Sequence, residues 1–328
     1  MQKPIISFYC PSKALVAAVP SRIADYWQWI NEVIPAHPAK LPPGEFGEFC
    51  LWHGPYSWTV QTWIHLRENE FECDLVSEIP DEGIIISHSD FWPTTLRPSS
   101  NQFLVEIKPD RNQNLRQAQF VLVQSAHDPL LREDIGRSGR VAVVPYWPQP
   151  SLIRRDSRRS TQVRQACFLG NGASFLSDVE VLTTRLEKIG ILFKMPPRAL
   201  WNDYSEVDLV IAVRDQAAFS STCLADTNVL RKPPNKLINA WLAEVPAILS
   251  PEPSYLDLRL SSLDFVDAKT VKEIVTAAER LKVDGDLYNR MIDNGRKRAA
   301  GFGSHEIVAN WISILTSIRQ TWADTESH

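Results

Sequence analysis

A basic loop followed by a helix start, at residues 231–250, is the part of this sequence best suited to chemistry. Arg231 and Lys232 precede a pair of prolines that fit a first helical turn, and apolar residues then recur at helical spacing. Free backbone N–H groups near Asn235 and Lys236, with the basic side chains around them, would attract an anion. The pattern predicts a phosphate-binding helix start, although an amphipathic helix with solvated lysines fits the same residues.

A glycine-rich loop at residues 168–175 follows a predicted strand and contains Gly170-Asn-Gly172. It lacks the third glycine of a dinucleotide-binding fingerprint, because Phe175 stands at that position. We interpret the loop either as a backbone surface that faces a diphosphate, in which Gly172 takes part, or as a simple turn.

Polar side chains stand at two further strand ends in the first half of the chain. His88 and Asp90 directly follow the predicted strand at residues 83–87, and α/β sheets place ligands at the carboxyl ends of their strands. His53 precedes Gly54 at another predicted strand-to-helix turn. A lone histidine at a strand end is more often a hydrogen-bonded structural residue than a catalytic one.

Short apolar runs bounded by turn residues supply the strands that would position these groups. In the first half we expect strands at 5–9, 48–52, 73–76, 83–87, 102–107 and 120–124, and helices at 23–34 and 59–69. In the second half we expect strands at 166–169, 191–194, 207–213 and 245–249, and helices at 178–188, 270–281 and 287–300. This alternation predicts an α/β fold with parallel sheets.

A proline-rich stretch, residues 145–162, interrupts the alternation and is interpreted as a linker. Its basic run is expected to be a solvated connector, with contact to an anionic lipid surface or acidic substrate as the alternative; the run comprises Arg154, Arg155, Arg158 and Arg159. We therefore expect one domain at 1–148 and a second at 149–305. The last segment, 306–328, is predicted to be an amphipathic helix that packs back on the first domain.

Length and composition bound the class of protein. With 328 residues, 44% of them hydrophobic, the chain can form two domains with separate cores. A net charge of −4 argues against a nucleic-acid partner but allows a local basic pocket. Five scattered cysteines show no metal-binding spacing, and no apolar stretch reaches membrane-spanning length. We expect a cytoplasmic protein with at most peripheral membrane contact.

These features together resemble the nucleotide-sugar glycosyltransferases of the GT-B fold. The similar segments are residues 54–63, 83–91, 120–125 and 204–214, the last leading to Lys232-Pro-Pro-Asn-Lys-Leu237. The resemblance implies two Rossmann-like domains that face a cleft. It also implies that the second domain binds the sugar nucleotide, that the first binds the acceptor, and that a sugar is transferred to a hydroxyl group.

Transfer of this kind requires stabilisation of the leaving diphosphate, which positive side chains and a helix start can provide without a metal. The resemblance implies a donor site formed by Gly172, Arg214, Arg231, Lys232, Asn235 and Lys236. We expect no required metal and no cofactor other than the nucleotide-sugar co-substrate.

Inverting transfer also requires a general base in the first domain. His88 is our first candidate, with Asp90 beside it, and His53 is the competing one. Most of the eleven tryptophans are expected in the core. An acceptor role is considered for the residues near the proposed acceptor loops, Trp52, Gly54, Tyr56, Trp58 and Trp92.

The chain departs from the family at one motif. Many retaining members carry two glutamates spaced as Arg231 and Asn239 are here, followed by a glycine where this chain has Glu244. Asn239 could still hydrogen bond a ribose hydroxyl, but retaining chemistry cannot simply be carried over. The alternative function is therefore a non-catalytic sugar- or nucleotide-binding protein on a degenerate transferase scaffold, and an epimerase or phosphorylase is a more distant one.

Overall fold

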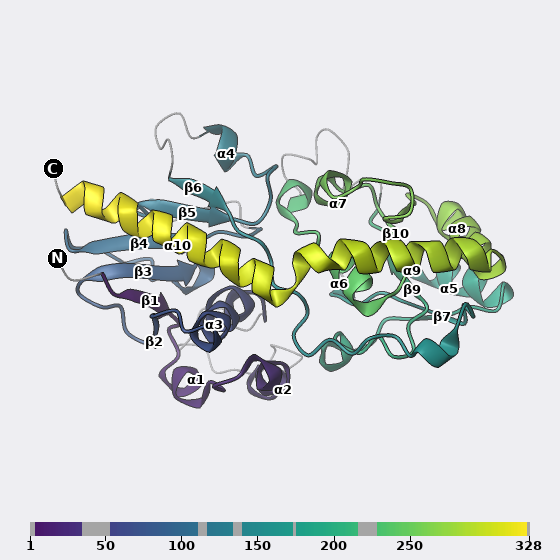
Figure 1. The fold of residues 1–328 in the computed structure, drawn as a ribbon, viewed down its shortest axis with the longest axis horizontal. Coiled ribbons are helices and arrows are strands. Elements are labelled where there is room, and N and C mark those ends of the chain that lie inside the picture. The colour runs from purple at the N-terminus through teal and green to yellow at the C-terminus, as the bar shows by residue number, and fades with distance from the viewer. Residues whose placement is uncertain are drawn as a thin grey trace. The chain divides into compact units, whose positions relative to one another are not determined.

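The computed structural model describes residues 4–34, 53–110, 117–133, 140–172, 175–215 and 228–326. The chain divides into two compact units (Figure 1). Unit 1 comprises residues 1–150 together with 304–328, and unit 2 comprises residues 151–303. Each unit contains its own parallel sheet.

The sheet of unit 1 has the strand order β2-β1-β3-β4-β5-β6, and every neighbouring pair is parallel. Its strands are β1 (Ile6–Tyr9), β2 (Asp74–Val76), β3 (Gly83–His88), β4 (Gln102–Ile107), β5 (Phe120–Val123) and β6 (Val141–Val143). The central strands β1, β3 and β5 are buried along their whole length. They are apolar without alternation because both faces of the sheet are covered.

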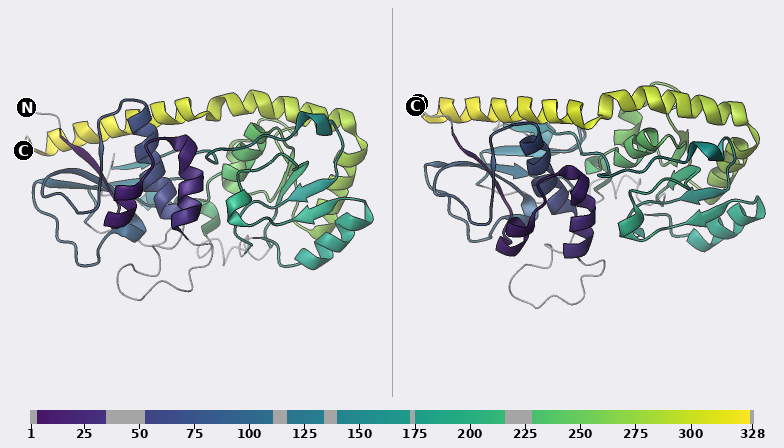
Figure 2. Two further views of the ribbon diagram at one scale, coloured as in Figure 1. Left: turned by 90° about the horizontal axis from the view of Figure 1, so that it is seen from below. Right: turned by 60° about the horizontal axis from the view of Figure 1, so that its bottom comes forward.

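The helices of unit 1 are α1 (Lys13–Ala18), α2 (Ile23–Val33), α3 (His53–Glu68), α4 (Leu130–Glu133) and α10 (Ser304–Glu326), with a 3₁₀ turn, η2, at Ser89–Phe91. Helix α10 runs along the sheet beside α3 (Figure 2), and the two share one apolar core. Trp311 of α10 stacks on Trp147 at 6.4 Å, and Trp147 stacks on His65 of α3 at 3.9 Å. This aromatic stack explains why the last helix belongs to unit 1.

The sheet of unit 2 has the order β11-β10-β9-β7-β8 and is also parallel throughout. Its strands are β7 (Gln165–Cys167), β8 (Leu192–Lys194), β9 (Leu209–Ala212), β10 (Ala247–Leu249) and β11 (Val266–Asp267). Its α-helices are α5 (Val179–Lys188), α6 (Asn235–Ala243), α7 (Pro253–Asp257), α8 (Val271–Val283) and α9 (Gly285–Ala299). Its 3₁₀ turns are η3 (Ser157–Arg159), η5 (Arg198–Leu200), η7 (Asn228–Arg231) and η8 (Ala300–Phe302).

Several element boundaries differ from those the sequence predicts. Helix α3 begins at His53, six residues before the predicted 59–69 helix. Its first turn contains Pro55, a residue that is tolerated there because the early N–H groups have no helical partner. Strand β6 and helices α1 and α7 were not predicted, since all are very short. The predicted strand at 48–52 lies outside the described residues.

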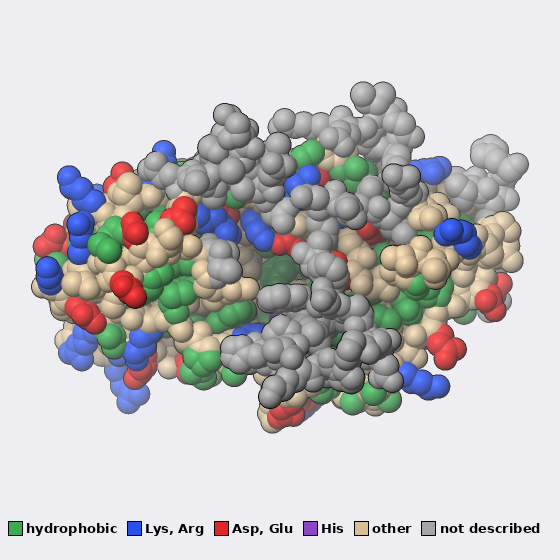
Figure 3. Space-filling view, turned by 180° about the vertical axis from the view of Figure 1, so that it is seen from behind, with side chains coloured by type: hydrophobic (Ala, Val, Ile, Leu, Met, Phe, Trp, Pro, Cys, Tyr) green, Lys and Arg blue, Asp and Glu red, His purple; other side chains and the backbone are tan. Residues whose placement is uncertain are grey.

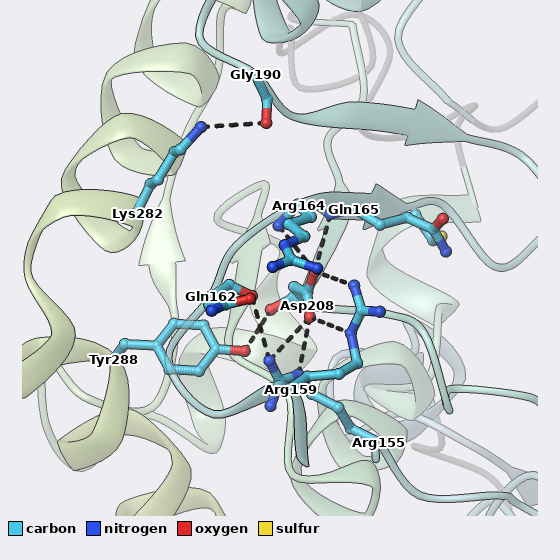
Figure 4. Close-up of polar contacts among 10 residues, drawn as sticks. Arg155, Arg159, Gln162, Arg164, Gln165, Gly190, Asp208, Lys282 and Tyr288 are labelled. Atoms are coloured by element: carbon cyan, nitrogen blue, oxygen red, sulfur yellow. Dashed lines mark hydrogen bonds and ion pairs between the residues drawn. The ribbon is translucent and has the colours of Figure 1, made fainter. Parts of the chain in front are cut away.

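The prediction that the basic run is a solvated connector is wrong for two of its four arginines (Figure 4). Arg155 donates to Oδ1 of Asp208 at 2.8 Å, and Arg159 donates to Oδ2 at 2.6 Å. Asp208 is fully buried and also accepts the backbone N–H groups of Arg164 and Gln165. A carboxylate that accepts hydrogen bonds from this many donors is strongly held, so Asp208 fixes residues 155–165 to the starts of β7 and β9. We call this set of contacts the Asp208 anchor.

Candidate functional site

Loops from three neighbouring strands of unit 2 meet at one edge of its sheet. Strands β7, β9 and β10 are parallel, so their carboxyl ends lie at the same edge. Gly170 follows β7, Arg214 follows β9 and Glu252 follows β10. Helix α6 connects β9 to β10, and it therefore begins at this edge, with Lys236 in its first turn. We call these four residues the unit 2 edge cluster.

Lys236 is the centre of the cluster. Its ammonium lies 5.3 Å from the centre of the Phe168 ring. Burial, followed by the nearby charge of Arg214, lowers the pKa of Lys236 to about 8. The side chain is therefore mainly protonated at pH 7, and its positive charge lies in a partly buried place where it interacts strongly with an anion.

Arg214 is held by groups at the end of β10. Its Nε donates to Oε1 of Glu252 at 2.7 Å, and its backbone N–H donates to the hydroxyl of Ser250 at 2.7 Å. The Glu252 side chain is 2% exposed. The pairing fixes the guanidinium on the same side of the sheet as Lys236, whose pKa it affects.

The two glycines of the loop after β7 have different neighbours. A Cβ atom added at Gly170 would lie 3.1 Å from Cε of Lys236, whereas one added at Gly172 would lie 3.2 Å from Cε of Met195. Gly170, which the sequence did not single out for donor binding, is thus the residue that leaves room for Lys236. Gly172 lies instead against the chain that follows β8.

The other basic candidates lie just before α6. Arg231 ends η7, Lys232 follows it, and Asn235 is the first residue of the helix. All three are partly exposed. Lys232 is close enough to Lys236 to contribute to the lowering of its pKa. The first turn of α6 thus combines free backbone N–H groups with a local excess of positive charge.

Asn239, for which the sequence suggested a ribose contact, lies in the core. It is 6% exposed, and its side chain hydrogen bonds with the hydroxyl of Tyr204. A ribose role for Asn239 is not supported by this position. Glu244, at the place of the family glycine, has a left-handed φ of 62° and pairs with Arg296 at 2.6 Å and Arg154 at 3.4 Å. These ion pairs account for a residue other than glycine at the end of α6.

His88, the first candidate base, is almost completely covered at the end of β3 in unit 1. It is 1% exposed, and its Nδ1 accepts the backbone N–H of Asp90 at 3.0 Å. Since Nδ1 uses its lone pair in this bond, the neutral ring carries its proton on Nε2. This geometry is that of a capping residue, and it does not favour His88 as a general base.

Asp90 and His53 lie at the same edge of the unit 1 sheet. The side chain of Asp90 is 8% exposed, and His53 is partly exposed. Asp90 belongs to η2, directly after β3, and its Oδ2 lies 3.7 Å from Nδ1 of His88. His53 is the first residue of α3. Because α3 leads into the start of β2, the helix itself begins at the carboxyl edge of the sheet. The Nδ1 of His53 lies 2.7 Å from the hydroxyl of Ser57, a contact that the spacing of one helical turn allows.

The aromatic residues proposed for acceptor binding are core residues. Tyr56 and Trp58 are 2% exposed, and Trp92 is 8% exposed. Tyr56 packs on Phe91 at 5.1 Å, and Trp58 packs on Tyr146 at 5.0 Å. A ring covered by protein cannot stack on a saccharide, so these positions do not favour an acceptor role for the three rings. Gly54 remains partly exposed with open space around it, and Trp52 lies outside the described residues.

Sequence reasoning overlooked two ionisable features at these edges. Glu252 was missed because a glutamate between two prolines reads as a surface turn. The other is a buried ion pair in unit 1, in which Lys108, the residue after β4, lies 3.2 Å from Asp128. The sequence feature that could have indicated this ion pair is the position of Lys108 directly after an apolar strand.

Among the described residues, no group of three or more His, Cys, Asp or Glu side chains is arranged to hold a metal ion. The single Asp-x-Asp sequence of the chain is Asp284-Gly285-Asp286. Asp284 caps α9 by accepting the backbone N–H of Leu287 at 2.9 Å. That sequence therefore has a helix-capping role.

On the face shown in Figure 3, acidic and basic side chains are interspersed. Within the part of the chain that the structure describes, no helix combines the length and apolar character needed to cross a membrane.

No family model and no curated protein sequence matches this chain. Solved structures do resemble it. HepE from Anabaena, in complex with UDP and glucose, has a TM-score of 0.53 at 11% identity, covering 96% of this chain and 100% of that one. A glycosyltransferase from Rickettsia africae has a TM-score of 0.52 at 9% identity, covering 97% and 99%.

TarM has a TM-score of 0.52 at 10% identity over 77% of this chain, and the chain spans 57% of the length of TarM. These likenesses concern the fold. They confirm the α/β class with two Rossmann-like units and the resemblance to GT-B glycosyltransferases.

Proposed function

We propose that this protein is a glycosyltransferase that moves a sugar from a nucleotide-sugar donor to a hydroxyl acceptor. The observation that carries the proposal is the unit 2 edge cluster, in which Lys236, in the first turn of α6, lies next to Gly170 and near Arg214. One similar solved structure, HepE, was determined in complex with UDP and glucose, which supports a nucleoside diphosphate as the group recognised here.

The donor chemistry follows from the charges of the cluster. As the bond between sugar and diphosphate breaks, negative charge builds on the leaving phosphate oxygens. Lys236 and Arg214 provide fixed positive charge, and the N–H groups at the start of α6 add hydrogen-bond donors. Lys232 and Arg231 raise the local positive potential. These groups suit stabilisation of a diphosphate without a required metal.

The acceptor would be activated from unit 1. Asp90 is the candidate that combines an ionisable carboxylate with a position at the carboxyl edge of the sheet; its side chain is 8% exposed, against 1% for that of His88. Its role would be to take the proton of the acceptor hydroxyl as the new glycosidic bond forms, which corresponds to inverting transfer. His88 would then act by fixing the backbone of Asp90. His53 is the rival base.

Thermal unfolding with a panel of nucleotides tests the donor part of the proposal. A ligand that binds the folded protein raises its melting temperature. We expect one of UDP, GDP, ADP, CDP and dTDP to raise it more than the others, with the same shift in EDTA. A shift that EDTA removes would contradict metal independence, and the absence of a shift for all five would contradict a nucleotide-sugar donor.

A non-catalytic sugar- or nucleotide-binding protein is the second candidate. It is favoured by the burial of Asn239, because the residue at the place of a family glutamate lies in the core. The variants Asp90→Asn and His53→Gln discriminate the two functions. In a transferase we expect Asp90→Asn to lower kcat about a hundredfold or more while donor affinity is unchanged. If His53→Gln alone causes this loss, His53 is the base. Donor binding without turnover in the wild type, across saccharide, lipid-linked and small-molecule acceptors, would favour the binding protein.

A further inference from the structure

We propose that Glu252 accepts hydrogen bonds from hydroxyl groups of the bound donor and thereby contributes to its selection. This inference rests on the proposed function, because it concerns the same edge of unit 2. Glu252 lies beyond residues 231–244, the part of the sequence in which the family motif is found. The inference therefore assigns the recognition of hydroxyl groups to a residue outside that motif.

The position of the carboxylate carries the inference. Glu252 is 1% exposed and lies between the end of β10 and the start of α7. Its Oε1 accepts from Nε of Arg214 at 2.7 Å. Within the described residues its Oε2 is buried and accepts no hydrogen bond. The charge of Glu252 also acts on Lys236, so the carboxylate is close to the proposed phosphate site.

A buried carboxylate oxygen without a donor is unfavourable. Such a group has lost its hydration, and a hydrogen bond that replaces the lost water recovers much of the cost. Buried polar atoms of native proteins are nearly always paired. An unpaired oxygen beside a proposed binding site is therefore explained if the ligand supplies the missing donor.

The charges around Glu252 indicate the kind of donor. Arg214 pairs with Glu252, and Lys236 is close enough to interact with it, so a further cation would be repelled. An anionic group would be repelled by the carboxylate itself. Neutral hydrogen-bond donors remain, and a pair of vicinal hydroxyl groups is well matched to a carboxylate, which can accept several hydrogen bonds.

The position of the diphosphate limits which parts of the bound donor can supply the hydroxyl groups. If Lys236 binds the phosphates, the groups attached directly to them are the ribose on one side and the transferred sugar on the other. Both present vicinal hydroxyl groups, whereas the base is separated from the phosphates by the ribose. The chemistry shared by the two sources is the vicinal diol, and an experiment can separate them.

Calorimetric affinities of the wild type for pyrophosphate, UDP, 2′-deoxy-UDP and UDP-glucose provide the first test, with the guanosine series used instead if GDP binds more tightly. A hydrogen bond to a charged acceptor corresponds to about a ten- to hundredfold change in affinity. If the ribose is the source, UDP binds that much more tightly than 2′-deoxy-UDP. If the sugar is the source, UDP-glucose binds that much more tightly than UDP. The absence of both preferences overturns the inference.

The variant Glu252→Gln provides the second test, because it keeps the size of the side chain and removes its charge. We expect the preference found in the wild type to disappear. We expect affinity for pyrophosphate to stay the same or to rise, since a negative charge near the phosphate site is lost. A variant that was merely misfolded would lose pyrophosphate binding as well. An unchanged preference in a folded variant overturns the inference.

The two proposals can fail separately. If none of the nucleoside diphosphates binds the wild type, the proposed function fails and this inference fails with it. If UDP binds and the preference survives in Glu252→Gln, only the inference fails. Should Glu252→Gln not fold, Glu252→Asp keeps the charge but shortens the side chain, and the same loss of preference is expected.

Discussion

The ammonium of Lys236 lies over the ring of Phe168, 5.3 Å from its centre. Lys236 comes from the first turn of α6, and Phe168 directly follows β7. The two are far apart in the sequence and meet at the carboxyl edge of the unit 2 sheet. Within the described residues no carboxylate lies at ion-pair distance from this ammonium. An aromatic face stabilises the cation without neutralising it, so the positive charge remains available to an anion.

Replacement of Lys236 by methionine should therefore weaken nucleoside diphosphate binding. The substitution keeps an unbranched side chain over the ring and removes the charge. We expect about a ten- to hundredfold loss of affinity, as for other charge-assisted hydrogen bonds, measured by calorimetry. Lys188→Met, at an exposed site in the last turn of α5, is the matched control and should bind normally. Equal affinities for the two variants would contradict a phosphate role for Lys236.

Nucleoside diphosphate binding should also depend on pH through the same side chain. The pKa of Lys236 is lowered from 10.5 to about 8, chiefly by burial. Bound phosphate favours the protonated form and raises this pKa. Affinity should thus fall as pH rises through 8, by at most tenfold per pH unit. Below pH 7 the lysine is protonated, and any change there reflects the terminal phosphate of the ligand, which ionises near pH 6, about the second pKa of a phosphate ester. Calorimetry between pH 6 and about 9.5 checks this, and Lys236→Met should abolish the fall.

The variant Gly170→Ala should affect binding more than stability. The added methyl would lie 3.1 Å from Cε of Lys236 and 3.1 Å from Cζ of Phe168. The lysine is the flexible neighbour, so we expect it to move away from the ring at little cost in folding. The melting temperature of the free protein should change little, while the increase caused by the nucleotide should shrink. Gly301→Ala, where a methyl meets open space, is the control.

The anchor at Asp208 should be important for stability. Asp208→Asn would leave the guanidinium of Arg155, whose side chain is 4% exposed, without its buried partner. Breaking a buried pair in this way costs about 3–5 kcal/mol, measured as the free energy of unfolding in urea. Asp156→Asn removes an ion pair with Arg158, whose side chain is 89% exposed, and should change stability little. A similar small effect for Asp208→Asn would contradict the anchor.

The pH dependence of stability provides an independent check of the same anchor. Burial alone would raise the pKa of Asp208, but hydrogen bonds from Arg159, the backbone and Arg155 lower it below 3.8. A depressed pKa in the folded state means that the stabilisation is complete above the unfolded value and is lost as pH falls through the folded one. We expect the difference in stability between wild type and Asp208→Asn to shrink below about pH 4.

Local features of this chain were predictable from the sequence because they depend on neighbouring residues. The continuous apolar run of β3 and the helical spacing of apolar residues in α6 identified both elements. The alternation of strands and helices identified the α/β class, which the structure and its likeness to solved glycosyltransferases confirm. Very short elements such as β6 escaped detection, since three residues hold too little periodic signal.

Burial and pairing, in contrast, were decided by the tertiary structure. Trp58 resembles a surface residue of an acceptor loop in the sequence, and packing against α10 makes it a core residue. Arg155 resembles part of a solvated connector, and a carboxylate 53 residues away fixes it. Glu252 became a candidate only when β9 and β10 brought Arg214 beside it. The sequence determined which residues could carry charge, whereas contacts between distant segments decided which charges are buried, and burial sets their strength.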